Sequence, residues 1–484
     1  HHAPDRFHQH EFVPQVGDQK VRVRSPHAGN RSAVPRGLRR VLYCPHMSAL
    51  AEVMRKVHLA PDELREHDAA ALRAANIGGY VRPRLPAGHP LREELRDDYL
   101  NQGARHALIR AELRPLLRAW AQAGIPGMLM KGFALAEFEY DTPAERFYGD
   151  VDLLVPNDPD VIARAVHLAI AHGWRSDGQH AHPERWTHEC AHLYGPGGHT
   201  KLDVHRFVHA WLSGPQERVQ RITRQVWADA VKCDWDDLPI LRPSPADRLV
   251  VNLALGRCWG DTGGLKPADL TDLHALQAKH ALETAELNRR AHELHAVHTW
   301  AAFQAVCHPD HPEYAQALQG HSASLKRAVR QDGGMPRSAR PRAILRRLPE
   351  LSVWMLRLLP DVYAANRAYR QGGDPRPALL SWATPAPGRL DPDRQGQIIS
   401  AARWWTRVLY PRQEKRGTCL PRAYATYRAL RRYGHPAIFV SGVTRTPTGV
   451  TGHAWVEDDR GIMETYGEPL VRLRFTETFR IPAP

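Results

Sequence analysis

The residues of this chain best suited to chemistry are Cys419 and His453. Cys419 lies where an apolar helical pattern begins, and His453 follows in a segment with the composition of a strand. A cysteine at a helix start and a histidine on a strand can form a thiolate nucleophile and its general base, because unpaired helical N–H groups favour the thiolate. Alternatively both are structural, a buried free thiol and an ordinary strand histidine. The two features together favour acyl transfer.

Simple patterns predict the elements that position these two residues. Apolar residues after Cys419 recur at helical spacing, and Gly434 is typical of the position just past a helix end. The run 437–443 predicts a buried strand. Residues 444–451 predict a turn, so that His453 begins a second strand.

A third group is needed to orient the histidine ring. A tight turn is expected to place Glu457 opposite Ile462, and the same antiparallel register then pairs Trp455 with Glu464. Glu464 would lie on the same face as His453, diagonally across from it and within reach of the ring. A slip of one residue would reverse that face.

Three features occur in order along this part of the chain: the run Cys-Leu-Pro-Arg-Ala from residue 419, a short helix ending in glycine, and the run His-Ala-Trp-Val-Glu from residue 453. Together they resemble the transglutaminase-like domain of lasso-peptide biosynthesis proteins. The resemblance covers about residues 390–470. It implies a leader peptidase with Cys419 as nucleophile and His453 as general base, while Glu464 stands near the position of the family's aspartate. The partners it implies are a precursor peptide, a leader-recognition protein and a cyclase.

Three carboxylates farther upstream have the spacing of ligands for hard divalent cations. Asp150 and Asp152 alternate along a predicted strand, so both project from one face. Asp203 lies on a later short strand, 200–205. Three such groups can hold magnesium ions that clamp a nucleoside triphosphate for in-line attack, although Asp-x-Asp alone is equally typical of an ordinary strand end.

A Lys-Gly pair precedes these carboxylates. The apolar strand 128–130 ends in Lys131 and Gly132, and a helical run, 133–140, follows. Gly132 would let the backbone approach a phosphate, while Lys131 or Arg146 could counter the phosphate charge. By itself, a Lys-Gly pair is as often a simple turn.

The order of these features resembles the uncharacterised nucleotidyltransferase family of the DNA polymerase β superfamily. A strand is followed by Lys-Gly and a helix, then by Arg and Asp-x-Asp, and later by Leu-Asp-Val-His. The resemblance covers about residues 60–300 and includes Asp272 on a later helix. It implies that the three carboxylates bind Mg²⁺, that Gly132 lines the nucleotide site and that a nucleoside triphosphate is a substrate. Phe133 stands where the superfamily often has a second small residue.

A group of histidines between residues 180 and 199 offers a competing metal site. His188, Cys190 and His192 alternate, which would place three soft ligands on one strand face and suit zinc. The chain has 29 histidines, and glycines and prolines surround the group, so coincidence is easy. The preferred interpretation is a half-exposed strand before Asp203.

Composition limits the classes of protein to be considered. The 484 residues can form two to three domains, and a net charge of +14 with a pI near 9.7 suits phosphate-bearing ligands, acidic peptides or nucleic acid. Arginine richness also follows from genomic base composition. Six cysteines without a Cys-x-x-Cys pair fit a reducing cytoplasm. No apolar run approaches the roughly 20 residues of a membrane span, so no membrane partner is expected.

The predicted fold class is α+β. Residues 47–320 are expected to form a polymerase-β-like domain with helical additions, in which 104–123 is the clearest amphipathic helix. Residues 321–388 are expected to be a helical, proline-rich connector, and 389–484 a small transglutaminase- or papain-like α+β domain. Residues 1–46, rich in His, Arg, Pro and Gly, are expected to be disordered, a tag or upstream sequence.

The sequence therefore predicts a bifunctional enzyme of lasso-type peptide biosynthesis, with a Cys-His leader peptidase and a metal-dependent nucleotidyltransferase-like domain. Two alternatives stay open. The first is a toxin-like nucleotidyltransferase that modifies RNA or protein, which the basic charge favours. The second is a catalytically degenerate scaffold that binds the precursor. Glu464 and Phe133, which differ from the residues typical of the two families, favour this alternative.

Overall fold

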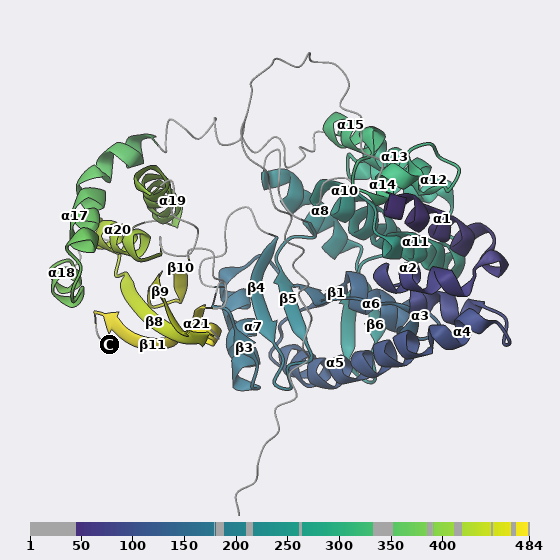
Figure 1. Ribbon diagram of the computed structural model, residues 1–484, viewed down its shortest axis with the longest axis horizontal. Helices are drawn as coiled ribbons and strands as arrows, with labels where there is room; N and C mark the ends of the chain where they lie inside the picture. Colours follow the sequence, from purple (N-terminus) through teal and green to yellow (C-terminus); the bar gives the residue numbers. More distant parts are fainter. Residues whose placement is uncertain are drawn as a thin grey trace, which may run out of the picture. The chain divides into compact units, whose positions relative to one another are not determined.

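The computed structural model describes most of the chain in two parts, one before residue 333 and one after residue 351 (Figure 1). Of the predicted segment 1–46, all but the last two residues lie outside the described residues. The described residues are 45–178, 180, 188–209, 216–260, 264–332, 352–384, 390, 392–410, 419–446, 449–465 and 471–482.

Seven described strands of the amino-terminal part form one mixed sheet in the order β3-β4-β5-β2-β1-β7-β6. The pairs β5/β2 and β1/β7 are parallel, and the other neighbours are antiparallel. The strands are β1 (Met128–Met130), β2 (Val151–Leu154), β3 (Arg175–Ser176), β4 (Glu189–Tyr194), β5 (Lys201–His205), β6 (Val231–Asp234) and β7 (Pro239–Arg242).

The helices of this part include the predicted amphipathic segment 104–123, which is confirmed as part of a longer helix that begins at Arg96. Many of the others pack into an apolar core around the buried side chains of Trp300 and Phe303. The α-helices are α1 (Pro45–Leu59), α2 (Ala69–Ala74), α3 (Gly78–Val81), α4 (Pro90–Glu94), α5 (Arg96–Gln122), α6 (Lys131–Phe138), α7 (Pro159–Ala171), α8 (Gln216–Ala228), α9 (Pro245–Asp247), α10 (Gly256–Gly260), α11 (Pro267–His280), α12 (Thr284–Glu293), α13 (Val297–Cys307), α14 (Tyr314–Leu318) and α15 (Ala323–Gln331). A π-helical stretch (Arg248–Leu255) precedes α10, and shorter 3₁₀ turns lie at Pro61–Glu63, Glu66–Asp68, Arg82–Arg84 and Pro143–Glu145.

Both faces of the sheet carry buried apolar residues, but Asp152 and Asp203 lie on only one of them. Val151 and Leu153 of β2 belong to an apolar core that includes residues of α5 and α7. Because successive strand residues point to opposite faces, Asp152 projects from the other face. Asp203 of β5 is paired directly with Asp152 and lies on that same face. Apolar packing behind the sheet thus determines which face carries the carboxylates.

The carboxyl-terminal part has a four-stranded antiparallel sheet in the order β10-β9-β8-β11. Helix α20 packs against this sheet through the fully buried side chains of Tyr427 and Leu430 (Figure 1). The strands are β8 (Ile438–Thr446), β9 (Gly449–Glu457), β10 (Ile462–Glu464) and β11 (Thr476–Ile481). The helices are α17 (Leu359–Gln371), α18 (Arg376–Ser381), α19 (Pro392–Leu409), α20 (Cys419–Arg432) and α21 (Val471–Arg474).

The structure confirms two local predictions here and corrects one. A helix does begin at Cys419, and a strand does cover 437–443 from Ile438 onward. The predicted turn over 444–451 is too long, because β8 and β9 continue to pair as far as Thr446 and Gly449, and β9 begins at Gly449 instead of at His453. The β-branched threonines and valines of this stretch favour extended backbone, and they outweigh its proline and glycines. The α+β class is confirmed for both parts.

A substitution at Gly442 of β8 can test how tightly the carboxyl-terminal sheet is packed. A Cβ at this position would lie 2.9 Å from the carbonyl oxygen of Thr476 and 3.1 Å from both Cβ of Phe475 and Cη2 of Trp455. We expect Gly442→Ala to destabilise the folded chain by about 1–3 kcal/mol, the usual cost of overpacking, measured by scanning calorimetry. Gly452→Ala on the paired strand is the control, since its Cβ would meet nothing nearer than 3.8 Å. Equal losses in both variants would contradict this packing.

Candidate active sites

Cys419 occupies the first position of α20 and is half-buried. The helix forms because its buried residues, among them Ala423, Tyr427 and Leu430, recur on one face. It ends before Gly434, whose φ of 87° is the left-handed conformation that glycine adopts most easily. The thiol therefore lies at a helix start, where N–H groups lack intrahelical partners.

His453 of β9 acts directly on the thiol. Burial works to raise the pKa of Cys419, but the hydrogen bond and charge of His453, with backbone hydrogen bonds from Ala454 and Leu420, hold that pKa below its ordinary value. A lowered pKa increases the thiolate fraction at neutral pH. The structure thus brings together the two residues that the sequence predicts as nucleophile and base.

The imidazole of His453 is oriented by two contacts. Its Nε2–H donates to the carbonyl oxygen of Thr465 at 2.9 Å, and its ring stacks on Phe475 with 5.1 Å between centroids. A carbonyl only accepts, so in the neutral ring Nε2 carries the proton and Nδ1 is the basic nitrogen. Sequence reasoning missed Thr465, because the contact uses a backbone atom that no side-chain pattern reveals.

Glu464 does not lie where the predicted strand register would place it. Glu457 does pair with Ile462, but the register then shifts and Glu464 pairs with Val456 instead of Trp455. The expectation that Glu464 shares a strand face with His453 is therefore wrong, since a one-residue shift reverses the face. The buried Glu464 carboxylate accepts a hydrogen bond from Nε of Arg403 on α19. Its part in catalysis stays a prediction.

The predicted metal-binding carboxylates lie close together at β2 and β5 of the amino-terminal sheet. Asp152 and Asp203 pair across β2 and β5, and Asp150 lies just before β2. Burial raises the pKa of Asp203 to about 6, and the charge of Asp150 adds to this rise while Lys201 opposes it. Lys201 Nζ donates to Oδ2 of Asp203 at 2.8 Å and lies 2.8 Å from Oδ1 as well.

Lys131 holds Asp152 in its charged form. Its Nζ donates to Oδ1 of Asp152 at 2.8 Å. Burial would raise the pKa of Asp152, but the Lys131 charge and the nearby His205 ring lower it well below its usual range. Lys131 begins α6 with a φ of 50°, in the left-handed region that side chains rarely adopt.

Gly132 and Arg146 have structural partners of their own. A Cβ on Gly132 would lie 2.6 Å from Cβ of Tyr148, so close backbone packing already requires glycine there. Arg146 forms a bidentate pair with Asp272 of α11, with both N–O distances at 2.7 Å. This ion pair raises the pKa of the largely buried Arg146 guanidinium against the effect of burial. Their roles at a nucleotide stay predictions.

The alternation of His188, Cys190 and His192 does not produce the three-ligand face considered for zinc. The pairing of β4 with β5 is irregular between Glu189 and Ala191, and Cys190 lies in the apolar core. The Cys190 thiol donates to the carbonyl of Val204 at 3.3 Å, and burial raises its pKa to about 12. The preferred interpretation of a strand before Asp203 is confirmed by β4, but the strand is less exposed than expected, since each of its residues is buried or partly buried.

Two family models match separate parts of the chain. An uncharacterised nucleotidyltransferase family matches residues 62–308, and the transglutaminase-like superfamily matches residues 355–480, starting inside the predicted connector 321–388. No curated protein and no solved structure gives a significant match. The matches confirm the two predicted kinds of domain in one chain, while the exact domain boundaries stay predictions.

The contact with His453 predicts how Cys419 will react. In His453→Ala the hydrogen bond and charge that lower the thiol pKa are lost and burial remains, so the pKa should rise. A rise of one unit reduces the thiolate fraction at neutral pH about tenfold. Peptide-resolved alkylation by iodoacetamide over a pH series should show this slowing at Cys419. The buried Cys190 and Cys258, with pKa values raised to about 12, serve as slow internal references. An unchanged Cys419 profile would refute the pairing.

Proposed function

We propose that the chain is a bifunctional enzyme, because it belongs to the uncharacterised nucleotidyltransferase family and also carries a transglutaminase-like region. One activity is a cysteine peptidase that removes the leader from a ribosomally made peptide of the lasso type. The other is a metal-dependent nucleotidyl transfer. The observation that carries the first is the lowered pKa of Cys419 beside His453.

The peptidase steps follow from the oriented pair. Nδ1 of His453 accepts the Cys419 proton, and the thiolate attacks the carbonyl carbon of the scissile amide. The N–H groups at the start of α20 offer donors to the oxyanion of the tetrahedral intermediate. The imidazolium returns its proton to the leaving amine, and a water molecule then hydrolyses the acyl-enzyme.

The choice of a leader peptide as substrate rests on the sequence around this pair. The run from Cys419 to Ala423 and the run from His453 to Glu457 resemble those of lasso leader peptidases, in the same order and with a similar spacing. In this proposal the precursor reaches the chain with a leader-recognition protein and leaves it for a cyclase.

Cleavage of a precursor peptide tests this activity. Cys419→Ala should lower the rate of leader removal by roughly 10⁴-fold or more, because it removes the nucleophile itself. The substrate is a lasso-type precursor peptide that carries its leader, and mass spectrometry measures the products. Cys233→Ser, which changes a half-buried cysteine of the other part, should cleave at the wild-type rate. If Cys419→Ala still cleaved normally, Cys419 would not be the nucleophile.

The amino-terminal residues fit Mg²⁺ and a nucleoside triphosphate. Asp150, Asp152 and Asp203 offer the oxygen ligands that Mg²⁺ prefers, and Asp152 and Asp203 are paired directly across β2 and β5. Held by these three carboxylates, the metal would supply positive charge that stabilises the negative charge developing during transfer. Lys131 keeps Asp152 ionised and so ready to serve as a ligand.

Asp152→Asn tests this second activity. The neutral side chain removes a charge from the metal site, so transfer of an α-labelled nucleotide should fall by at least about 10²-fold. Asp160→Asn, on the exposed first turn of α7, is the control, and leader cleavage should be unchanged in both variants. The precursor peptide and RNA are offered as separate acceptors, and label on RNA alone would favour the toxin-like alternative. Transfer that survives Asp152→Asn would exclude this site.

A further inference from the structure

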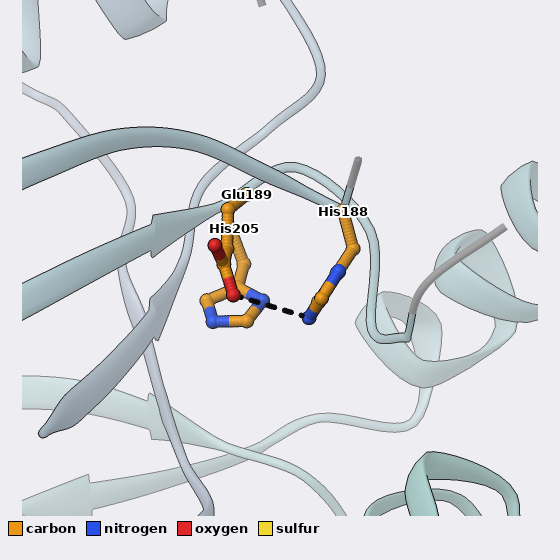
Figure 2. A group of neighbouring side chains, drawn as sticks. All are labelled: His188, Glu189 and His205. Atoms are coloured by element: carbon orange, nitrogen blue, oxygen red, sulfur yellow. Dashed lines mark ion pairs between the residues drawn. The ribbon is translucent and has the colours of Figure 1, made fainter. Parts of the chain in front are cut away.

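Three side chains next to the carboxylate face converge in a group that neither activity uses. His188 and Glu189 lie at the start of β4, and His205 ends β5 in register with Glu189. One ligand atom from each lies within 4.8 Å of the other two. Figure 2 shows the three side chains turned toward one another, with His188 Nε2 at 3.5 Å from Oε1 of Glu189.

The His205 ring is buried, and one of its nitrogens has no partner among the described residues. Its side chain is 0% exposed, Nε2 lies 2.8 Å from Oδ1 of Asp152, and it is Nδ1 that has no hydrogen bond within the described part of the chain. A buried polar group without a partner destabilises the folded state and calls for an explanation. A ligand that takes an imidazole lone pair would supply the missing partner.

The neighbours of His205 are residue types that bind metal ions. The His188 and His205 rings lie 4.7 Å apart between centroids. His192 Nε2 lies 3.0 Å from Oε2 of Glu189, while His188 Nε2 lies 3.5 Å from Oε1. Two imidazoles and one carboxylate thus offer ligand atoms within 4.8 Å of one another.

We propose that His188, Glu189 and His205 bind a divalent transition-metal ion of the zinc or cobalt type. Metal–ligand bonds of about 2.0–2.2 Å require ligand atoms within about 4.4 Å of one another, so only a small closing of the group is needed. Imidazole nitrogens suit these ions, whereas Mg²⁺ prefers oxygen ligands. This site shares no residue with the magnesium site proposed on the three aspartates.

Such an ion has two consequences for the sheet. It ties the start of β4 to the end of β5, so it stabilises the folded state in proportion to its binding. It also places positive charge beside Asp152, which His205 contacts. Glu189 additionally lies with His192 and Asp203 in a second close group, so the ion would adjoin both carboxylates of the β2–β5 pair.

Cobalt provides the direct test, because its visible absorption reports coordination by nitrogen and oxygen. Full-length protein, stripped with a chelator, should bind one equivalent of Co²⁺ with a visible spectrum that Zn²⁺ displaces and Mg²⁺ does not. His188→Ala should weaken this binding by at least about 100-fold, since even loss of an outer-shell partner costs about 10- to 100-fold. His199→Ala, an exposed histidine just beyond β4, should bind as the wild type does.

Glu189→Gln keeps the result interpretable if His188→Ala folds poorly. It preserves the shape of the side chain and removes its charge, so the spectrum should be lost while far-UV circular dichroism is retained. Added Zn²⁺ should raise the melting temperature of the wild type and His199→Ala but not of Glu189→Gln. The proposal is overturned if the wild type shows no stoichiometric Co²⁺ spectrum, or if Glu189→Gln binds Co²⁺ as tightly as the wild type.

Discussion

The parallel pairing of β2 with β5 is the constraint on which the amino-terminal sites depend. Its register sets Asp152 beside Asp203 and Leu154 beside His205, so two carboxylates and an imidazole share one face. The alternate residues, such as Val151, are buried in the apolar core behind the sheet. A one-residue slip would exchange these faces, so apolar burial on one side fixes where the charges lie on the other.

Features that depend on local pattern could be predicted from the sequence. The helix that starts at Cys419 carries its own signals in the apolar spacing and in Gly434, and the structure has it where expected. The face shared by Asp152 and Asp203 follows from strand alternation once both strands are recognised. The pairing of Cys419 with His453 needed one further step, the order of helix and strand, which a resemblance to known domains supplied.

Features that depend on irregular pairing or distant contacts could not be predicted. The register shift in β10 pairs Glu464 with a residue other than the expected one, and no residue type in that stretch indicates the shift. Arg146 meets Asp272, which lies 126 positions away and is brought near only by the folded helices. His205 illustrates a missed inference, because it lies two residues after Asp203 and alternation alone places both on one face.

The left-handed backbone conformation of Lys131 affects which residues evolution would retain at this position. An L side chain in that conformation costs about 1–2 kcal/mol, whereas glycine adopts it freely. A lineage with no use for the ammonium group could gain stability by replacing this lysine with glycine. A lysine that persists at such a position marks a trade-off between stability and activity, in which local strain is retained together with a positive charge beside Asp152.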